Sequence, residues 1–341
     1  MGYFDLRLII SVLILGLNCW YGSKAISRIK NSSGSLVVAA IQPNIQQVQK
    51  WSQDWVSEIY ARLKRTTRQA ITASAPDLVV WPETALPDFV RASQPSQDLI
   101  NELLALKTPI LVGTMDFDET GSKTNYYNSS LLFTPESGLV ARYNKRHLVI
   151  FGEYVPMKGI LPFLGCLTPI EGSFTAGNTN TVFMAGSSAL PFSALICFED
   201  TIASLARESV RNGARLLINQ TNDAWFDPSC ASRQQMAHCV FRCIENRVGA
   251  VRATNTGLTC FIDRNGVVYG ALKPVAEYPC EPEYSVKPVL IAKRDMKYTF
   301  YTRYGDVFAL AALAITLPVF AGAILSFRKR NHSIRNNHSA L

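Results

Sequence analysis

Residues 78–87 read LVVWPETALP, and this stretch decides which kind of fold the sequence builds. Its four leading apolar residues predict a buried strand, which Pro82 ends because proline has no N–H to donate to a neighbouring strand. Glu83 follows at once, so a carboxylate is expected at the carboxyl end of that strand. Upstream, residues 36–41 read LVVAAI, a continuous apolar run typical of a strand that is covered on both faces.

Outward from these two strands, strand and helix signals alternate along the chain. Gly213 is expected to close one helix just past its end, and Ser232 is expected to cap the start of another. Helices are predicted at 52–73, 201–212 and 232–246, and strands at 110–113, 193–197, 215–219, 258–262 and 267–269, with a hairpin turn at 263–266. The alternation over residues 35–291 predicts one α/β domain, without internal repeats or low-complexity segments.

Two apolar segments at the ends of the chain predict membrane helices. Hydrophobic residues make up 48% of the sequence and the mean hydropathy is +0.08, both high for a soluble enzyme. Residues 8–21 carry no charge but fall short of the roughly 20 residues of a spanning helix, so a cleaved signal peptide competes with an anchor. Residues 307–327 carry no charge and precede Arg328, Lys329 and Arg330, which predicts a spanning helix with a cytoplasmic basic tail.

The charge balance and the cysteines exclude some classes of function. The net charge is +8, but no dense Lys/Arg block lies inside the domain, so no nucleic-acid partner is expected. The eight cysteines match no zinc-binding spacing, and burial is expected for most of them, although an exported domain can pair some. Neither a metal nor a cofactor is expected.

Three polar residues near predicted strand ends are candidates for chemistry. Glu83 follows LVVWP, Lys145 lies in the segment RYNKRH, and Cys197 ends the strand SALIC. Each has an ordinary alternative, namely a helix-start carboxylate, a solvated charge and a small buried hydrophobe. Together they indicate a nucleophile with a nearby base and cation.

The segments around these residues resemble the nitrilase superfamily and, within it, the apolipoprotein N-acyltransferase family. The resemblance runs from Ser35 to about Tyr269, and its motifs occur in the family's order. They are QPNI at 42–45 with Lys50-Trp51, WPETALP at 81–87, YNK at 143–145, FGEYVP at 151–156, CFE at 197–199, TNDAWF at 221–226 and RATNTG at 252–257. The GEYVP and NDAWF segments favour the acyltransferase branch over general amidases.

The resemblance implies an α-β-β-α sandwich with a catalytic triad of Glu83, Lys145 and Cys197. In such a triad the thiolate of Cys197 is the nucleophile and Glu83 is the general base. Lys145 stabilises the oxyanion together with the backbone N–H of Phe198. By the same resemblance Glu153 and Glu199 are supporting carboxylates. Trp51, Asn128 and Phe198 are expected to line an acyl pocket, although each has an equal claim to be a core residue.

The implied reaction moves a fatty acyl group from a phospholipid, through a thioester on Cys197, to the α-amino group of an N-terminal diacylglyceryl-cysteine on a lipoprotein. The implied location is the bacterial cytoplasmic (inner) membrane, with the catalytic domain on the periplasmic face. Expected units are an anchor and linker at 1–33, the catalytic domain at 34–292, a linker at 293–304, a transmembrane helix at 305–327 and a basic tail at 328–341.

The sequence departs from the family in its membrane region. Members of the family carry several more membrane helices before the catalytic domain, whereas one short candidate precedes it here. The expectations are therefore an acyltransferase with a separate membrane-protein partner, an anchored carbon-nitrogen hydrolase (amidase) with the same triad, or an inactive membrane-anchored binding module. The intact triad argues against the last. The apolar loop at 151–181 argues for lipid, with Ile160, Leu161, Phe163 and Leu164 expected to enter the membrane interface.

Overall fold

The apolar run at 36–41 forms the middle of strand β1 (Gly34–Gln42). Alternate side chains of a strand point to opposite faces of its sheet. Leu36 and Val38 accordingly pack between two sheets, whereas Ala39 and Ile41 pack beneath helices. One strand therefore contributes to two separate cores, which explains why it is apolar on both faces.

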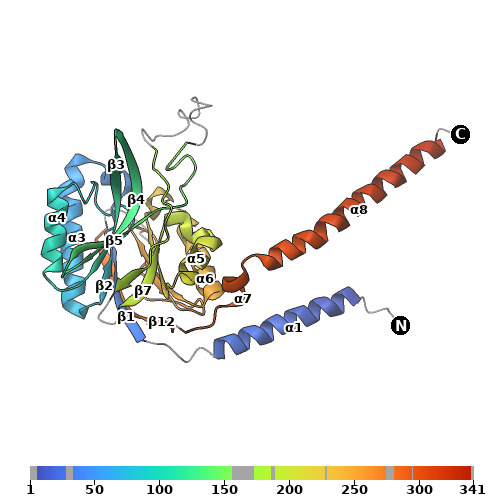
Figure 1. Ribbon diagram of the computed structural model, residues 1–341, viewed down its shortest axis with the longest axis horizontal. Helices are drawn as coiled ribbons and strands as arrows, with labels where there is room; N and C mark the ends of the chain where they lie inside the picture. Colours follow the sequence, from blue (N-terminus) through green and yellow to red (C-terminus); the bar gives the residue numbers. More distant parts are fainter. Residues whose placement is uncertain are drawn as a thin grey trace.

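The computed structural model describes residues 6–27, 34–155, 173–185, 189–226, 229–273, 280–293 and 295–338. Two six-stranded sheets face each other, with helices on both outer sides (Figure 1). The first sheet has the order β12-β1-β2-β3-β4-β5, and the second has the order β11-β10-β9-β8-β7-β6. This is the predicted α-β-β-α sandwich.

Parallel pairing in the centre of each sheet brings several strand ends to one edge. In the first sheet β1, β2 and β3 are parallel, and in the second β7, β8 and β9 are parallel. The first sheet consists of β1, β2 (Leu78–Val80), β3 (Ile110–Thr120), β4 (Lys123–Thr134), β5 (Gly138–Asn144) and β12 (Glu283–Ile291). The second consists of β6 (Phe183–Ala185), β7 (Leu190–Ile196), β8 (Leu216–Thr221), β9 (Gly249–Thr254), β10 (Cys260–Ile262) and β11 (Val268–Tyr269).

Helices cover the outer face of each sheet. Helices α3 (Val56–Ser74) and α4 (Gln94–Leu104) cover the first sheet, and α5 (Ala203–Arg211) and α6 (Ala231–Asn246) cover the second (Figure 1). Short helices are α2 (Gln47–Lys50) and α7 (Phe300–Tyr304). Helix α7 lies within the predicted linker at 293–304 and packs on α5 and α6. Its Thr302 is fully buried and bonds the side chain of Asn246.

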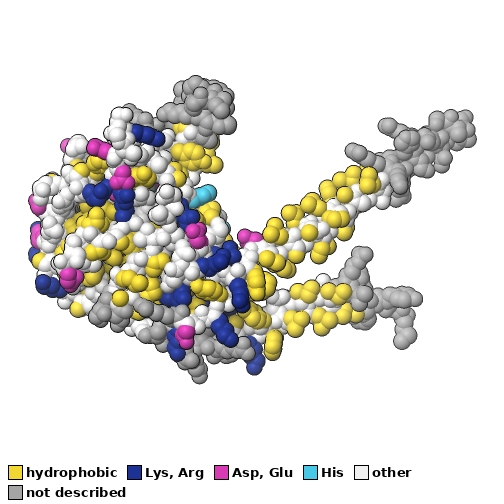
Figure 2. All heavy atoms as spheres, viewed as in Figure 1, with side chains coloured by type: hydrophobic (Ala, Val, Ile, Leu, Met, Phe, Trp, Pro, Cys, Tyr) yellow, Lys and Arg dark blue, Asp and Glu magenta, His cyan; other side chains and the backbone are white. Residues whose placement is uncertain are grey.

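Two apolar helices extend from the same side of the sandwich (Figure 1). Helix α1 (Leu6–Ser27) contains a candidate membrane span of 19 residues, Leu8–Ile26. Helix α8 (Val307–His338) contains a second span of 21 residues, Val307–Phe327. Neither span is buried in the protein, and apolar side chains cover both (Figure 2). The predicted membrane helix at each end is therefore present as a candidate span.

Two local predictions need correction. Helix α6 begins at Ala231 with Cys230 as its N-cap, so Ser232 lies inside the helix. The Ser232 hydroxyl instead donates a 2.7 Å hydrogen bond to Asp223, which holds the helix against the end of β8. The strand predicted at 193–197 ends at Ile196, and Cys197 begins a short 3-10 helix, η3 (Cys197–Thr201). Residues 160–164 of the expected membrane-contacting loop lie outside the described residues.

Candidate active site

Glu83 stands where the chain leaves β2 and turns sharply. Thr84, the next residue, has a φ of 43°, and the Ala85 N–H donates to the Gly113 carbonyl oxygen over 2.8 Å. A Cβ atom on Gly113 would lie 2.2 Å from the Pro82 carbonyl oxygen, so only glycine allows the two segments to approach this closely. Gly113 therefore fixes the backbone that carries Glu83.

Both carboxylate oxygens of Glu83 are engaged. Oε1 accepts a 2.7 Å hydrogen bond from the Asn128 amide, and Oε2 accepts a 2.9 Å bond from the Asn222 backbone N–H. The Lys145 ammonium lies 3.5 Å from Oε1. Contacts from the middle of β4 and from the ends of β5 and β8 thus hold a buried carboxylate in one orientation.

Lys145 is the first residue after β5 and is almost completely buried, with 1% exposure. Its backbone N–H donates to the Asn128 carbonyl, and its own carbonyl accepts from the Gly177 N–H, each over 2.8 Å. Its Nζ lies 2.8 Å from Glu153 Oε1. Burial lowers the pKa of the Lys145 ammonium, but the neighbouring Glu83, Cys197 and Glu153 raise it by more than burial lowers it. The pKa therefore lies above its ordinary value. Lys145 therefore stays cationic at neutral pH.

Cys197 occupies a strained position at the end of β7. Its φ is 52°, a left-handed conformation that is rare for residues other than glycine and is concentrated at functional sites. Its carbonyl accepts a 3.1 Å bond from Asn219, and its thiol hydrogen-bonds Thr221. Burial raises the pKa of the thiol, Glu83 raises it further and Lys145 opposes the increase. The resting thiol is therefore neutral and needs a base when it reacts.

The structure separates the two expected supporting carboxylates. Glu153 lines the same cavity as Lys145 and accepts hydrogen bonds from Asn128 and the Val149 N–H, over 2.9 Å each. Glu199 is fully buried behind Cys197 and does not line that cavity. It accepts bonds from the backbone N–H groups of Ile196, Arg146 and His147 and from the Tyr143 hydroxyl. Glu199 thus ties the turn that carries Cys197 to the segment after Lys145.

A buried ion-pair network supports the same turn from the helix side. Arg252 has no exposed surface and lies 3.0 Å from carboxylate oxygens of both Asp200 and Asp223. It also donates a 2.7 Å bond to the side chain of Asn219, which in turn binds the Cys197 carbonyl. Buried charges are tolerated when they are paired in this way.

The three candidate catalytic residues open onto one cavity of about 490 Å³. Trp51, Asn128 and Phe198, expected to line an acyl pocket, all line this cavity, and their role in binding stays a prediction. Phe198 packs edge-to-face on Phe226, with 5.7 Å between ring centroids. Apolar side chains dominate the rest of the wall, and the most exposed of them are Trp51, Ile150, Phe151 and Trp225.

Lys50 lies at this site, although the motif analysis, which included the segment Lys50-Trp51, assigned it no role. It is 2% exposed, and its ammonium donates a 3.1 Å bond to the backbone carbonyl of Glu83. Burial lowers the pKa of Lys50 to about 8, while the charge of Glu83 partly opposes this. The sequence pointed to Lys50 only through its position beside Trp51.

In the described ranges, His, Cys, Asp and Glu side chains form no group of three that could ligate a metal ion.

Comparison with known proteins identifies relatives of this chain. The sequence profile of the carbon-nitrogen hydrolase family matches residues 37–304. The chain is similar to proteins named apolipoprotein N-acyltransferase. That of Geobacter metallireducens is 37% identical over 324 residues, covering 95% of this chain and 60% of the relative. That of Brucella melitensis is 32% identical over 276 residues, covering 78% and 51%. The chain therefore spans about half to three-fifths of the length of these curated relatives.

Solved structures share the fold at low sequence identity. A branch 10 nitrilase-superfamily protein of Saccharomyces cerevisiae aligns with a TM-score of 0.55 and 17% identity, over 75% of this chain and 90% of that one. A carbon-nitrogen hydrolase of Helicobacter pylori aligns with a TM-score of 0.55 and 12% identity, over 75% and 89%. These likenesses concern the sandwich and leave the substrate open.

Proposed function

The chain belongs to the carbon-nitrogen hydrolase family, and from that premise we propose that it is a membrane-anchored N-acyltransferase. Cys197 takes a fatty acyl group from a phospholipid as a thioester and passes it to the α-amino group of an N-terminal diacylglyceryl-cysteine on a lipoprotein. Glu83 is the base and Lys145 the oxyanion partner. The relatives' names support this reaction class, and the site supports the residue roles.

The observation that carries the proposal is the apolar mouth of the cavity. Trp51, Ile150, Phe151 and Trp225 line it and leave much of their surface exposed, 61% in the case of Trp225. Clustered exposed apolar side chains mark surfaces that bind lipid or other apolar partners. A small hydrophilic amide would gain nothing from such a rim, whereas an acyl chain would bury it.

In the first half-reaction Glu83 accepts the proton of the Cys197 thiol as Sγ attacks the ester carbonyl carbon. The carbonyl electrons move onto its oxygen, where the Lys145 ammonium and the Phe198 N–H stabilise the charge. The ester C–O bond then breaks, and the departing alcohol oxygen takes the proton from Glu83. Cys197 remains as a thioester, and the neutral resting thiol explains why a base must stand beside it.

In the second half-reaction the acceptor amine attacks the thioester carbonyl carbon. Glu83 accepts a proton from the amine nitrogen, the C–S bond breaks, and Sγ takes the proton back. An amide is formed and the enzyme returns to its resting state. In each half-reaction Glu83 accepts a proton from the attacking group and returns it to the leaving group.

The proposed placement puts the catalytic domain on the periplasmic face of the inner membrane, with anchors at 1–33 and 305–327 on either side of a catalytic unit at 34–292. Arg328, Lys329 and Arg330 follow the second span directly and favour a cytoplasmic carboxyl end. Lys24, Arg28 and Lys30, at the domain end of the first span, carry less weight, because large domains cross the membrane largely regardless of charge. Protease added outside spheroplasts should digest the domain, and complete protection would reverse the placement.

Intact-protein mass spectrometry tests the chemistry. The full chain is incubated with phospholipid vesicles, and we expect a mass increase of one fatty acyl group that hydroxylamine removes. Cys197→Ala should show no increase, whereas Cys239→Ala, at a buried thiol outside the cavity, should keep it. Ammonia release from small amides without a lipid adduct would identify an amidase. A folded protein that gives neither the lipid adduct nor ammonia would be a binding module.

A further inference from the structure

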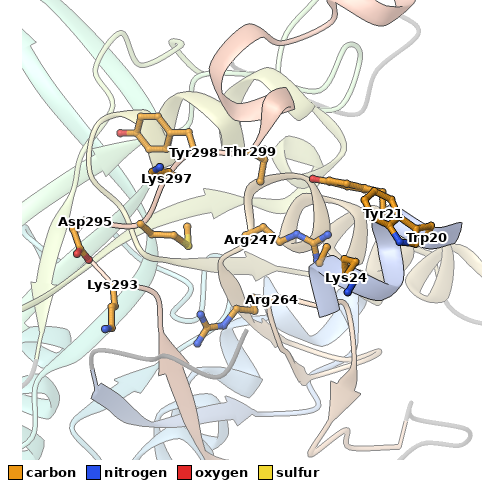
Figure 3. Close-up of a pocket in the computed structure, with 12 residues that line it drawn as sticks. Trp20, Tyr21, Lys24, Arg247, Arg264, Lys293, Asp295, Lys297, Tyr298 and Thr299 are labelled. Atoms are coloured by element: carbon orange, nitrogen blue, oxygen red, sulfur yellow. The ribbon is translucent and has the colours of Figure 1, made fainter. Parts of the chain in front are cut away.

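A second cavity lies where α1 reaches the domain, away from Cys197 (Figure 3). It has a volume of about 520 Å³ and shares no lining residue with the active-site cavity. Trp20, Tyr21 and Lys24 of α1 form one side. Arg247 and Arg264 lie between α1 and the chain segment that follows β12 (Figure 3).

Cationic side chains dominate this cavity. They come from four separate segments, namely α1, the residue after α6, the turn between β10 and β11, and the segment after β12. The cations are Lys24, Arg247, Arg264, Lys293 and Lys297, and among the lining residues that the structure describes only Asp295 is acidic. Lys and Arg side chains also gather on the face from which both apolar helices leave (Figure 2). Such a concentration of one sign attracts anions.

Arg264 is the most enclosed of these cations, with 7% exposure. Burial lowers the pKa of its guanidinium, and the neighbouring Asp263 opposes the shift only in part. Asp263 also accepts hydrogen bonds from the backbone N–H groups of Asn265 and Val267. A bound anion would stabilise the charged guanidinium, and phosphate is the anion whose oxygens match its planar donors.

Aromatic side chains place this cavity at the level of lipid headgroups. Trp20 and Tyr21 are exposed near the domain end of the span Leu8–Ile26. Phe300 and Tyr304 are exposed just before the span Val307–Phe327. Tyr and Trp are enriched where membrane helices cross the interface between lipid and water. The cations therefore lie where phosphate groups of the adjoining leaflet are found.

We propose that this basic cavity binds the phosphate of an anionic phospholipid headgroup. The bound lipid fixes the depth and rotation of the domain relative to α1. It is a structural lipid and not the acyl donor, since the two cavities share no residue. The inference rests on α1 and α8 spanning the membrane and is independent of the chemistry at Cys197.

Native mass spectrometry of the full chain tests the site, using Cys197→Ala protein so that acyl transfer cannot contribute. The detergent-solubilised protein is titrated with phosphatidylglycerol or with phosphatidylcholine that carries the same acyl chains. A cation near an anionic lipid surface contributes roughly fivefold in affinity. We expect phosphatidylglycerol to bind at least about tenfold more tightly than phosphatidylcholine. The Lys24→Gln, Lys293→Gln, Lys297→Gln triple variant should lose most of this preference.

A matched control removes three cations from α3, on the opposite side of the sandwich. The Lys64→Gln, Arg65→Gln, Arg68→Gln variant loses the same charge and should keep the preference, because these residues form surface ion pairs far from α1. The Lys293→Arg, Lys297→Arg variant should keep it too, and thermal unfolding checks that each variant is folded. Equal affinity for the two lipids, or an equal loss in the control, would overturn the site. If inorganic phosphate displaced the bound lipid at an equal concentration, the cavity would be a site for a soluble anion and not for a lipid headgroup.

Discussion

Lys50→Met should make the domain more stable and less active. The pKa of Lys50 is lowered from 10.5 to about 8, chiefly by burial. At about 1.4 kcal/mol for each pH unit, this difference corresponds to about 3 kcal/mol of unfavourable burial at neutral pH. Methionine has a similar shape without the charge, but it leaves the Glu83 carbonyl without the 3.1 Å bond, at a cost of about 1 kcal/mol. We expect a net gain of about 2 kcal/mol in the free energy of unfolding.

The sign of the pH dependence follows from the direction of the shift. The folded state binds the Lys50 proton less tightly than the unfolded chain, so deprotonation favours folding. Above about pH 10.5 Lys50 is deprotonated in both states and its burial carries no charge penalty. The penalty grows as the pH falls and is complete below about 8. The advantage of Lys50→Met should therefore be greatest at pH values below about 8 and shrink as the pH rises towards 10.5.

Thermal and denaturant unfolding of the two proteins at matched pH values, in the same detergent, measure this difference. Lys64→Met on the exposed face of α3 is the control, and it should change stability little at any pH. A destabilised Lys50→Met protein with no dependence on pH would refute the reasoning. It would mean that attraction between Lys50 and Glu83 outweighs the burial of the ammonium.

Activity should change in the opposite direction. Without the bond from Lys50 the Glu83 backbone is less firmly held, and we expect roughly a tenfold slower formation of the thioester, within the range of misplaced catalytic groups. If the charged form of Lys50 is required, the wild-type rate falls as the pH rises through about 8. That alkaline limb should be absent from Lys50→Met.

Three further predictions concern the candidate active site. Glu83→Gln and Lys145→Met should each lower the rate of thioester formation on the order of 100-fold. The double variant should fall far short of the product of these losses, because residues that act as a unit are not additive. Gly113→Ala should push the carbonyl before Glu83 aside and cost about 100-fold in rate with a folded protein, as shown by kinetics and circular dichroism. Phe151→Ser with Trp225→Ser should slow acylation by phospholipid vesicles while acylation by a soluble short-chain ester persists, and equal losses on both substrates would contradict a lipid-facing rim.

Several parts of the fold were out of reach of local pattern. Strands β4 and β12 and helix α4 were not predicted, and β5 was expected only as a strand that ends near Lys145. Yet β3 and β4 pair continuously from Ile110 with Phe133 to Thr120 with Lys123. Residues 118–125 are polar, charged or glycine and form the exposed or half-buried end of this hairpin, so they lack the apolar run that marked β1 and β2. Ser232 fitted the sequence pattern of a helix N-cap, but its hydroxyl donates a hydrogen bond to Asp223, which only the folded structure brings near it.

The sequence by itself determined the α/β sandwich, the two terminal apolar helices and the selection of Glu83, Lys145 and Cys197. Short-range pattern predicted the α/β class and the two apolar helices, because buried strands and membrane helices are both continuous apolar runs. The sandwich arrangement and the selection of the three residues were implied by the resemblance of the motifs around them to the nitrilase superfamily. Tertiary structure alone decided which residues face the cavity. It placed Glu153 beside Lys145 and Glu199 behind Cys197, although both are acidic residues in similar motifs. It also buried Lys50 against Glu83 and gathered cations from four segments around α1. The physical reason is that burial and proximity depend on how distant segments pack, which no local pattern encodes.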